Sequence, residues 1–176
     1  MSEGKRAFVS YEYKEISVNG AYLSNYLDGY ESFGWHVDRE PGGPDMRGKV
    51  TLHLKRERHV LNKAELTRLQ RQFEACMAAI QALEASKQSR ATMVALSVAL
   101  AGTAFMAGST FAVTAEPPII WLCVLLAIPG FLGWGAAYFV YRWVLQKRAD
   151  EVAPLIEMKY DEMEETCRKG SELMRL

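Results

Sequence analysis

Two histidines in the N-terminal part of the chain are the first residues whose type and spacing could do chemistry. If Glu40 stands opposite Lys49 across a β-hairpin, the same register places His36 opposite His53. Two imidazoles on one face can begin a metal site or a proton-linked site. The other ligands that a metal needs are not evident, so we favour a pair of solvated surface residues. We therefore predict no metal site and no cofactor, and keep His36 and His53 only as the alternative metal candidates.

The rest of the sequence favours a protein that is not an enzyme. No Ser-His-Asp order, phosphate-binding glycine loop or pair of buried carboxylates can be assembled, and the apolar region lacks an ionisable side chain until Arg142. The cysteines Cys76, Cys123 and Cys167 have neither C-x-x-C spacing nor a disulfide context. We expect no metal or redox role for them.

Two long uncharged runs indicate the class of protein. The first extends from residue 91 to 113 and the second from 119 to 141, with Glu116 in the short break between them. As a helix, each run spans roughly 34 Å, which is enough to cross a hydrocarbon core of about 30 Å. The first run begins too far along the chain to be a cleaved signal peptide. The sequence therefore predicts a transmembrane helical hairpin between water-soluble parts.

Basic residues flank these runs and predict their orientation. They are Lys87, Arg90, Arg142, Lys147 and Arg148, whereas the connecting turn holds only Glu116. Because basic residues stay on the cytoplasmic side, both termini should be cytoplasmic in a multi-pass protein of the inner membrane. The same five side chains are expected to contact anionic lipid. Aromatic residues agree with this orientation, with Phe111 and Trp121 at the outer interface and Tyr138, Tyr141 and Trp143 at the inner one.

The elements that must position the histidines form a small α+β head. Alternating side chains predict a strand over residues 8–16 with Val9, Tyr11 and Tyr13 facing inward. An amphipathic helix from Leu23 should end at Gly34. A hairpin follows, in which Trp35, Val37, Leu52 and Leu54 face the helix. The predicted order is βαββ, with the helix on one face of the sheet.

Three pieces of this head carry a family resemblance. Tyr11-Glu12-Tyr13-Lys14, Gly34-Trp35 and Leu52-His53-Leu54-Lys55-Arg56 occur in order along the chain. Together they resemble a small bacterial domain family of unknown function, and the similarity covers about residues 8 to 57. Here Phe33 replaces the glutamate that usually precedes Gly-Trp. The resemblance implies a βαββ fold and a bacterial origin, and the family has no established activity to carry over.

Helical segments are expected to join the head to the membrane. Residues 58–90 contain neither proline nor glycine, and apolar positions form a heptad seam: Leu66, Leu69, Phe73, Cys76, Ile80 and Leu83. This helix should continue without a break into the first span. The C-terminal segment repeats similarly, and Pro154 predicts a kink or a fresh helix start there.

Two interpretations of the seam stay open. Its apolar stripe could pack within one chain, or it could form an intermolecular seam in a homo-oligomer, which we favour. Segment 58–90 is enriched in basic residues and the C-terminal segment is locally acidic, so antiparallel pairing would place opposite charges together. Small residues also line the spans: Ala91, Ala95, Ala99, Ala104, Gly108, Ala112, Gly130, Gly133 and Ala137. Some of them should close the hairpin, and two stripes on one helix suggest a second partner.

The leading hypothesis is a membrane-anchored, homo-oligomeric binding or scaffold module. Its predicted parts are a cytoplasmic βαββ head (1–57), a coiled-coil helix (58–90), two spans (91–113 and 119–144) with an external turn (114–118), and a cytoplasmic amphipathic helix (145–176). Its expected partners are membrane lipid, further copies of itself and an unidentified cytoplasmic protein, and not nucleic acid.

The alternative hypothesis is an oligomeric ion channel with Glu116 at the outer mouth of the pore. The order of elements resembles that of the mitochondrial calcium uniporter pore subunit, and Glu116-Pro117 is similar to the end of its filter motif. However, Ala112 and Val113 stand where that motif requires Trp and Asp. A carboxylate followed by proline is also common just before a helix start.

Overall fold

The computed structural model describes residues 9–60, 62–114 and 119–175. These residues belong to two units. Residues up to 78 together with those from 159 onward form one, which we call the head unit, and residues 79–158 form the other, which we call the hairpin unit. The head unit therefore includes the beginning of one long helix and the end of another, beyond the residues 1–57 that the sequence assigned to the head.

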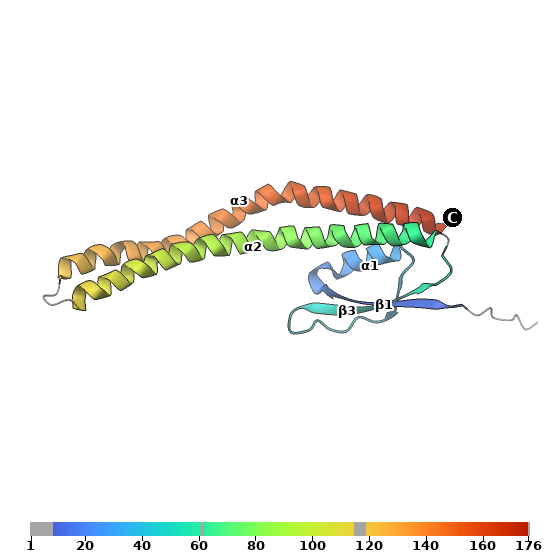
Figure 1. Ribbon diagram of the computed structural model, residues 1–176, viewed down its shortest axis with the longest axis horizontal. Helices are drawn as coiled ribbons and strands as arrows, with labels where there is room; N and C mark the ends of the chain where they lie inside the picture. Colours follow the sequence, from blue (N-terminus) through green and yellow to red (C-terminus); the bar gives the residue numbers. More distant parts are fainter. Residues whose placement is uncertain (1–8, 61, 115–118, 176) are drawn as a thin grey trace, which may run out of the picture. The chain divides into compact units, whose positions relative to one another are not determined.

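A three-stranded antiparallel sheet forms one layer of the head unit. Its strands are β1 (Tyr11–Asn19), β2 (His36–Arg39) and β3 (Lys49–Glu57), and β3 lies in the middle. A short 3-10 helix, η1 (Gly20–Tyr22), and helix α1 (Leu23–Glu31) connect β1 to β2. Figure 1 shows α1 on the side of the sheet that faces α2. The predicted βαββ order and antiparallel hairpin are confirmed.

Gly34 ends the turn after α1, as predicted. Its φ is 78°, in the left-handed region that glycine adopts without steric cost. The Gly34 amide donates to the Glu31 carbonyl at 2.9 Å, and the Trp35 amide donates to the Tyr30 carbonyl at 3.0 Å. These bonds satisfy the last carbonyls of the helix and direct the chain into β2.

Strand β1 turns the opposite face inward from the one predicted. Tyr11 and Tyr13 are 43% and 68% exposed, whereas Glu12 and Lys14 are half-buried on the side of the helices. The described strand also begins at Tyr11, later than expected. The physical reason is that α2 supplies oppositely charged partners for Glu12 and Lys14, so these polar side chains lie inward at low cost. Ile16 and Val18 share this inward face and are half-buried and buried, so the apolar residues at the end of the strand indicate the correct face and Tyr11 and Tyr13 at its start do not.

The predicted register of the hairpin is wrong. His36 pairs with Lys55 and Val37 with Leu54, and a bulge follows before Arg39 pairs with His53. The loop closes near β3, where the Asp45 amide donates to the Lys49 carbonyl and its carboxylate accepts the Lys49 amide, each at 2.8 Å. Lys49 is therefore not opposite Glu40. The shift is by two residues, so it keeps the predicted face, and Val37 is 40% exposed on β2, an edge strand of the sheet.

An aromatic core joins the sheet to the helices within the head unit. The ring of Phe73 has its centroid 5.7 Å from that of Tyr30, 5.8 Å from that of Phe33 and 6.0 Å from that of Tyr26. Trp35, which precedes β2, is buried in the same core. Gly170, near the C-terminal end of the chain, packs against Phe33 and has no room for a side chain. Residues from both ends of the chain thus complete one core.

Two long helices account for most of the remaining chain. Helix α2 (Lys63–Thr114) runs without interruption from the head core into the first apolar run, as predicted. Helix α3 (Ile120–Arg175) is continuous through Pro129 and Pro154. The predicted fresh start at Pro154 therefore does not occur, because proline costs one hydrogen bond but does not by itself end a helix that is held by packing on both sides. Val152 and Ile156, on either side of it, are buried.

Small residues close the hairpin unit, as the sequence indicated in part. A Cβ on Gly102 would lie 3.0 Å from the Gly130 carbonyl oxygen, and a Cβ on Gly133 would lie 3.0 Å from Gly102 Cα. The Ser109 hydroxyl donates to the Cys123 carbonyl at 3.0 Å. Close backbone approach of this kind is how helices associate in lipid. Gly102 was not among the predicted small residues.

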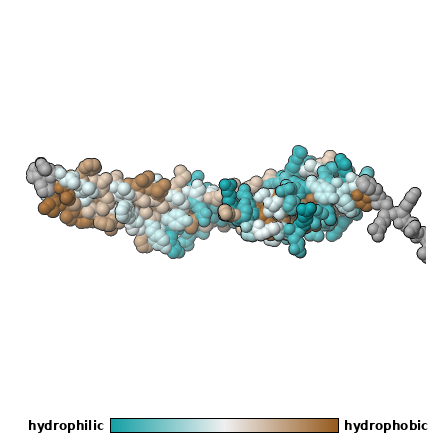
Figure 2. All heavy atoms as spheres, turned by 90° about the horizontal axis from the view of Figure 1, so that it is seen from below, coloured by the Kyte–Doolittle hydropathy of each residue, from teal (hydrophilic) through white to brown (hydrophobic). Residues whose placement is uncertain are grey.

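The apolar runs of both helices are exposed. In the most apolar 18-residue window of each, 11% of the residues of α2 and 6% of those of α3 are buried. Large side chains such as Phe111, Trp121 and Phe139 are 70–76% exposed. On the face drawn in Figure 2, brown apolar side chains gather over these parts of the helices. Both helices are thus long and apolar enough to cross a membrane.

Candidate functional site

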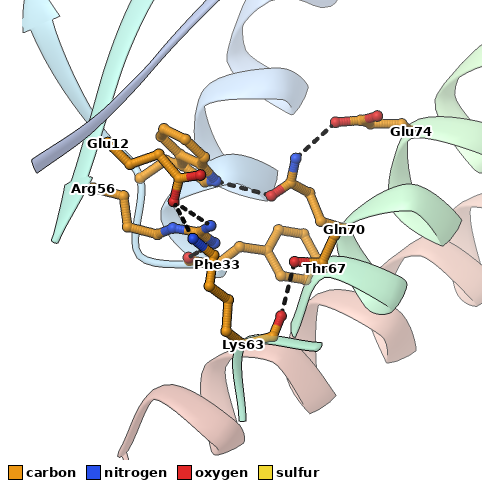
Figure 3. Close-up of polar contacts among 8 residues, drawn as sticks. Glu12, Phe33, Arg56, Lys63, Thr67, Gln70 and Glu74 are labelled. Atoms are coloured by element: carbon orange, nitrogen blue, oxygen red, sulfur yellow. Dashed lines mark hydrogen bonds and ion pairs between the residues drawn. The ribbon is translucent and has the colours of Figure 1, made fainter. Parts of the chain in front are cut away.

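A network of polar contacts ties the sheet to α2 in the head unit (Figure 3). Glu74 accepts hydrogen bonds from Lys14 Nζ at 2.5 Å, Tyr30 Oη at 2.7 Å and Gln70 Nε2 at 2.9 Å. Gln70 Oε1 in turn accepts the indole N–H of Trp35 at 2.9 Å. Burial opposes ionisation of Glu74, but the three donors outweigh it and hold the pKa of this carboxyl below its ordinary value.

A second set of contacts surrounds Arg56 at the end of β3. Its Nη2 lies 3.2 Å from Glu12 Oε2, its Nη1 donates to the Phe33 carbonyl at 3.4 Å, and its guanidinium carbon is 4.4 Å from the centroid of the Trp35 ring. Lys63 Nζ lies 3.0 Å from the same oxygen of Glu12. Figure 3 shows Arg56 and Lys63 meeting at Glu12. The alternation of side chains along β3 predicts that Arg56 points inward, because it continues the inward row of Leu52 and Leu54.

These two networks are structural. The Glu74 carboxylate is shared by three donors, and burial together with the hydrogen bond to Glu74 raises the pKa of the Tyr30 hydroxyl, so neither group is prepared to transfer a proton near neutral pH. A cavity of about 490 Å³ does border Arg56, between Tyr11, His36, Lys55 and the end of α3. Its lysine is already paired with Asp38 at 3.0 Å, and its arginine with Glu12.

The structure separates the two histidines of the predicted metal pair. His36 borders the cavity beside Arg56, whereas His53 lies near Glu15, with 3.8 Å between His53 Nδ1 and Glu15 Oε2. The register explains the separation, because His36 faces Lys55 across the ladder and not His53. Within the described residues, no three potential ligands come together to hold a metal ion.

Two of the three thiols lie in surroundings that oppose ionisation. Cys76, Cys123 and Cys167 are free. Burial raises the pKa of Cys167 to about 11 and raises that of Cys76, so both are protonated at neutral pH.

The predicted oligomer seam is buried within the single chain. Leu66, Leu69, Phe73, Cys76 and Ile80 are at most 6% exposed, and Leu83 is half-buried. The acidic residues of the C-terminal part of α3 pair along their own helix, as in Lys159–Glu162 and Glu165–Lys169. Burial of the seam therefore needs no second chain, and an intermolecular seam remains a prediction. Glu116 lies outside the described residues, so the channel hypothesis also remains a prediction.

A cavity in the hairpin unit is lined by several basic residues. It has a volume of about 450 Å³ and lies between α2 and α3 where the uncharged runs end. Its lining consists of Arg90, Met93, Val94, Trp143, Val144, Lys147, Arg148 and Glu151. The spacing of these residues along each helix, in steps of one, three and four, places them on one face of α2 and one face of α3.

The cavity concentrates positive charge. Arg148 Nη1 lies 2.9 Å from Glu151 Oε2, and Lys147 Nζ lies 5.4 Å from the centroid of the Trp143 ring. The hydrogen bond from Arg148, together with the charges of Lys147 and Arg90, holds the pKa of the Glu151 carboxyl below its ordinary value. Three cations therefore surround one carboxylate.

Three of the five predicted lipid contacts come together in this cavity. They are Arg90, Lys147 and Arg148. Lys87 and Arg142 do not line it, and Arg142 instead lies 3.4 Å from the Tyr138 hydroxyl. The sequence missed Met93, Val94 and Glu151, because only the packing of α2 beside α3 shows that they share a wall with the basic residues.

No protein-family model, curated protein or solved structure matches this chain. The resemblance of residues 8–57 to a bacterial domain family therefore remains a prediction from the sequence.

Proposed function

We propose that this chain is a membrane-anchored protein whose α2 and α3 cross a bilayer and whose head unit is a cytoplasmic binding or scaffold module. The observation that carries the proposal is the exposure of the apolar runs. A core helix of a water-soluble protein buries its apolar side chains, whereas the most apolar windows here are 11% and 6% buried. Apolar patches of this extent need a cover, and lipid is the cover that two uncharged runs of this length fit.

The charge distribution supports the orientation. The basic residues Arg90, Lys147 and Arg148 gather at the end of the hairpin that adjoins the head-unit segments of the chain. Such residues are retained on the cytoplasmic side during insertion. We therefore assign the head unit and both termini to the cytoplasm.

The outer face of the sheet is the surface that supports a partner-binding role. Its inner face packs on the helices, but Tyr11 and Tyr13 on β1 remain exposed beside His53 and Lys55 on β3. Exposed tyrosines among polar side chains are typical of protein-binding surfaces. This face is where we place contact with the cytoplasmic partner.

Membrane insertion and orientation can be tested together. Membranes carrying the protein are extracted with alkaline carbonate, and the variants Thr114→Cys and Ser17→Cys are treated with an impermeant maleimide before and after lysis. We expect the protein to stay in the membrane, Thr114→Cys to react in intact cells and Ser17→Cys only after lysis. The parent chain with its native cysteines sets the background. Release by carbonate would overturn the anchoring, and the opposite labelling would overturn the orientation.

Homo-oligomerisation is tested separately by the mass of the protein in detergent. We also propose that the protein forms a homo-oligomer, through surface other than the seam already buried in one chain. A multiple of the monomer mass that survives dilution is the expected result. A monomer at all concentrations would remove this part of the proposal and leave the anchoring intact.

A further inference from the structure

The basic cavity between α2 and α3 combines features that a solvated charge cluster does not need. Its walls include Met93 and Trp143, which are 66% and 65% exposed, directly beside Arg90, Lys147 and Arg148. Large exposed apolar surface next to cations matches a ligand that is itself amphipathic. The cavity also lies where the uncharged runs end, which is the depth of lipid headgroups in a bilayer.

The positive charge of the cavity is only partly paired. Arg148 uses Nη1 on Glu151, but its Nε is buried and has no hydrogen-bond partner. Within the part of the chain that the structure describes, Arg90 and Lys147 form no ion pair. A buried guanidinium N–H without a partner is costly unless a ligand supplies an acceptor. Glu151 offsets only one of the three positive charges, so the cavity favours an anionic acceptor.

We propose that this cavity binds the phosphate group of an anionic phospholipid, with Arg90, Lys147 and Arg148 contacting the phosphate oxygens and Trp143 and Met93 lying against its glycerol and first acyl carbons. Arginine offers paired N–H donors in a geometry that fits phosphate. Basic pockets between membrane helices at the cytoplasmic side recognise headgroups in this way. The inference rests on the proposed membrane anchoring and adds a ligand class to it.

The test measures phospholipid bound to the full-length protein. Protein in neutral detergent is titrated with phosphatidylglycerol or phosphatidylcholine, and bound lipid is counted by native mass spectrometry. The test variant is Arg90→Gln with Arg148→Gln. The matched control is Lys87→Gln with Arg142→Gln, which removes the same charge close to the same boundary but outside the cavity. Arg90→Lys with Arg148→Lys keeps the charge and shows whether the arginine geometry matters.

We expect the wild-type chain to prefer phosphatidylglycerol over phosphatidylcholine. The test variant should lose about thirtyfold in affinity for phosphatidylglycerol, since two basic residues are removed. The control should stay within about threefold of wild type, and the lysine variant should lie between the two. Inorganic phosphate at millimolar concentration should not displace the lipid.

Three results would overturn the proposal. Equal losses in the test and control variants would show diffuse attraction between surface charges. Displacement by inorganic phosphate would show a site for a free anion instead of a lipid. Absence of any preference for phosphatidylglycerol would show no headgroup site. If all variants still resist carbonate extraction, such a failure concerns this site alone and not the anchoring.

Discussion

Gly29 of α1 lies directly against the ring of Phe73 of α2, so closely that a Cβ at position 29 would overlap three atoms of that ring. The contact sets the distance between the two helices in the head unit. Phe73 is fully buried and contacts Tyr26, Tyr30 and Phe33, so its ring has little freedom to move aside.

We therefore expect Gly29→Ala to destabilise the head unit, although alanine is the better helix former. Overpacking costs about 1 to 3 kcal/mol and helix propensity returns about 1 kcal/mol, so the net loss should be about 1 kcal/mol and at most about 2 kcal/mol. Thermal unfolding of the full chain, followed by near-ultraviolet circular dichroism, measures it. Gly43→Ala is the control, because nothing lies within 4 Å of its Cβ position. A melting temperature for Gly29→Ala equal to that of Gly43→Ala would contradict the tight contact.

Trp35 should be the most costly aromatic residue of the head unit to remove. It is 4% exposed, its indole N–H donates to Gln70, and its ring lies against Tyr30 and the guanidinium of Arg56. Trp35→Ala should cost about 3 to 5 kcal/mol. The comparison is Tyr13→Ala, which removes an aromatic ring that is 68% exposed and should cost less than about 1 kcal/mol. Chemical denaturation followed by a tryptophan-independent probe, such as amide circular dichroism, measures the free energy of unfolding. A similar loss of that free energy in both variants would show that this core is misassigned.

Glu74 should make the head unit sensitive to acid. Its folded-state pKa lies below the ordinary 4.5, so its contribution to stability is present above pH 4.5 and is lost as the pH falls below that value toward the folded-state pKa. Glu74→Gln should therefore lower the melting temperature at pH 7 and flatten its decline below pH 4.5. Glu31→Gln, at an exposed position on the same unit, is the control. Parallel pH profiles for the wild type and Glu74→Gln would refute this role for the carboxylate.

Closure of the hairpin should depend on Gly102 and not on glycines as a class. Gly102→Val would place methyl groups against the Gly130 carbonyl and the Trp134 ring, whereas Gly135→Val points into open space. We expect Gly102→Val to unfold at a lower fraction of SDS in mixed micelles of SDS and a mild detergent. The free energy of unfolding should fall by about 1 to 3 kcal/mol, since overpacking separates the helices. Gly135→Val should leave the midpoint unchanged. Equal sensitivity at both positions would mean that the small residues do not form this contact.

The features that depend on local pattern were predictable from the sequence. The length and uncharged composition of the two runs require helices that are apolar all round, whatever surrounds them. The order βαββ follows from side-chain alternation and from the helical spacing that ends at Gly34. The role of Gly34 at the end of the helix could be predicted because few other residues adopt a φ of 78° without strain.

Other features needed the tertiary structure because they depend on what lies across from a residue. Ile16 and Val18 mark the inward face of β1, but Glu12 and Lys14 can lie on that face because Lys63 and Glu74 of α2 pair with them, and no local pattern reports charged partners so distant in sequence. The histidines were misplaced because the Asp45 turn and the bulge before Arg39 shift the register. The seam through Phe73 is buried inside one chain, since the sheet, α1 and the end of α3 cover it. The basic cavity likewise exists because hairpin closure at Gly102 brings Arg90 beside Arg148, a juxtaposition decided by helix packing and not by the charges themselves.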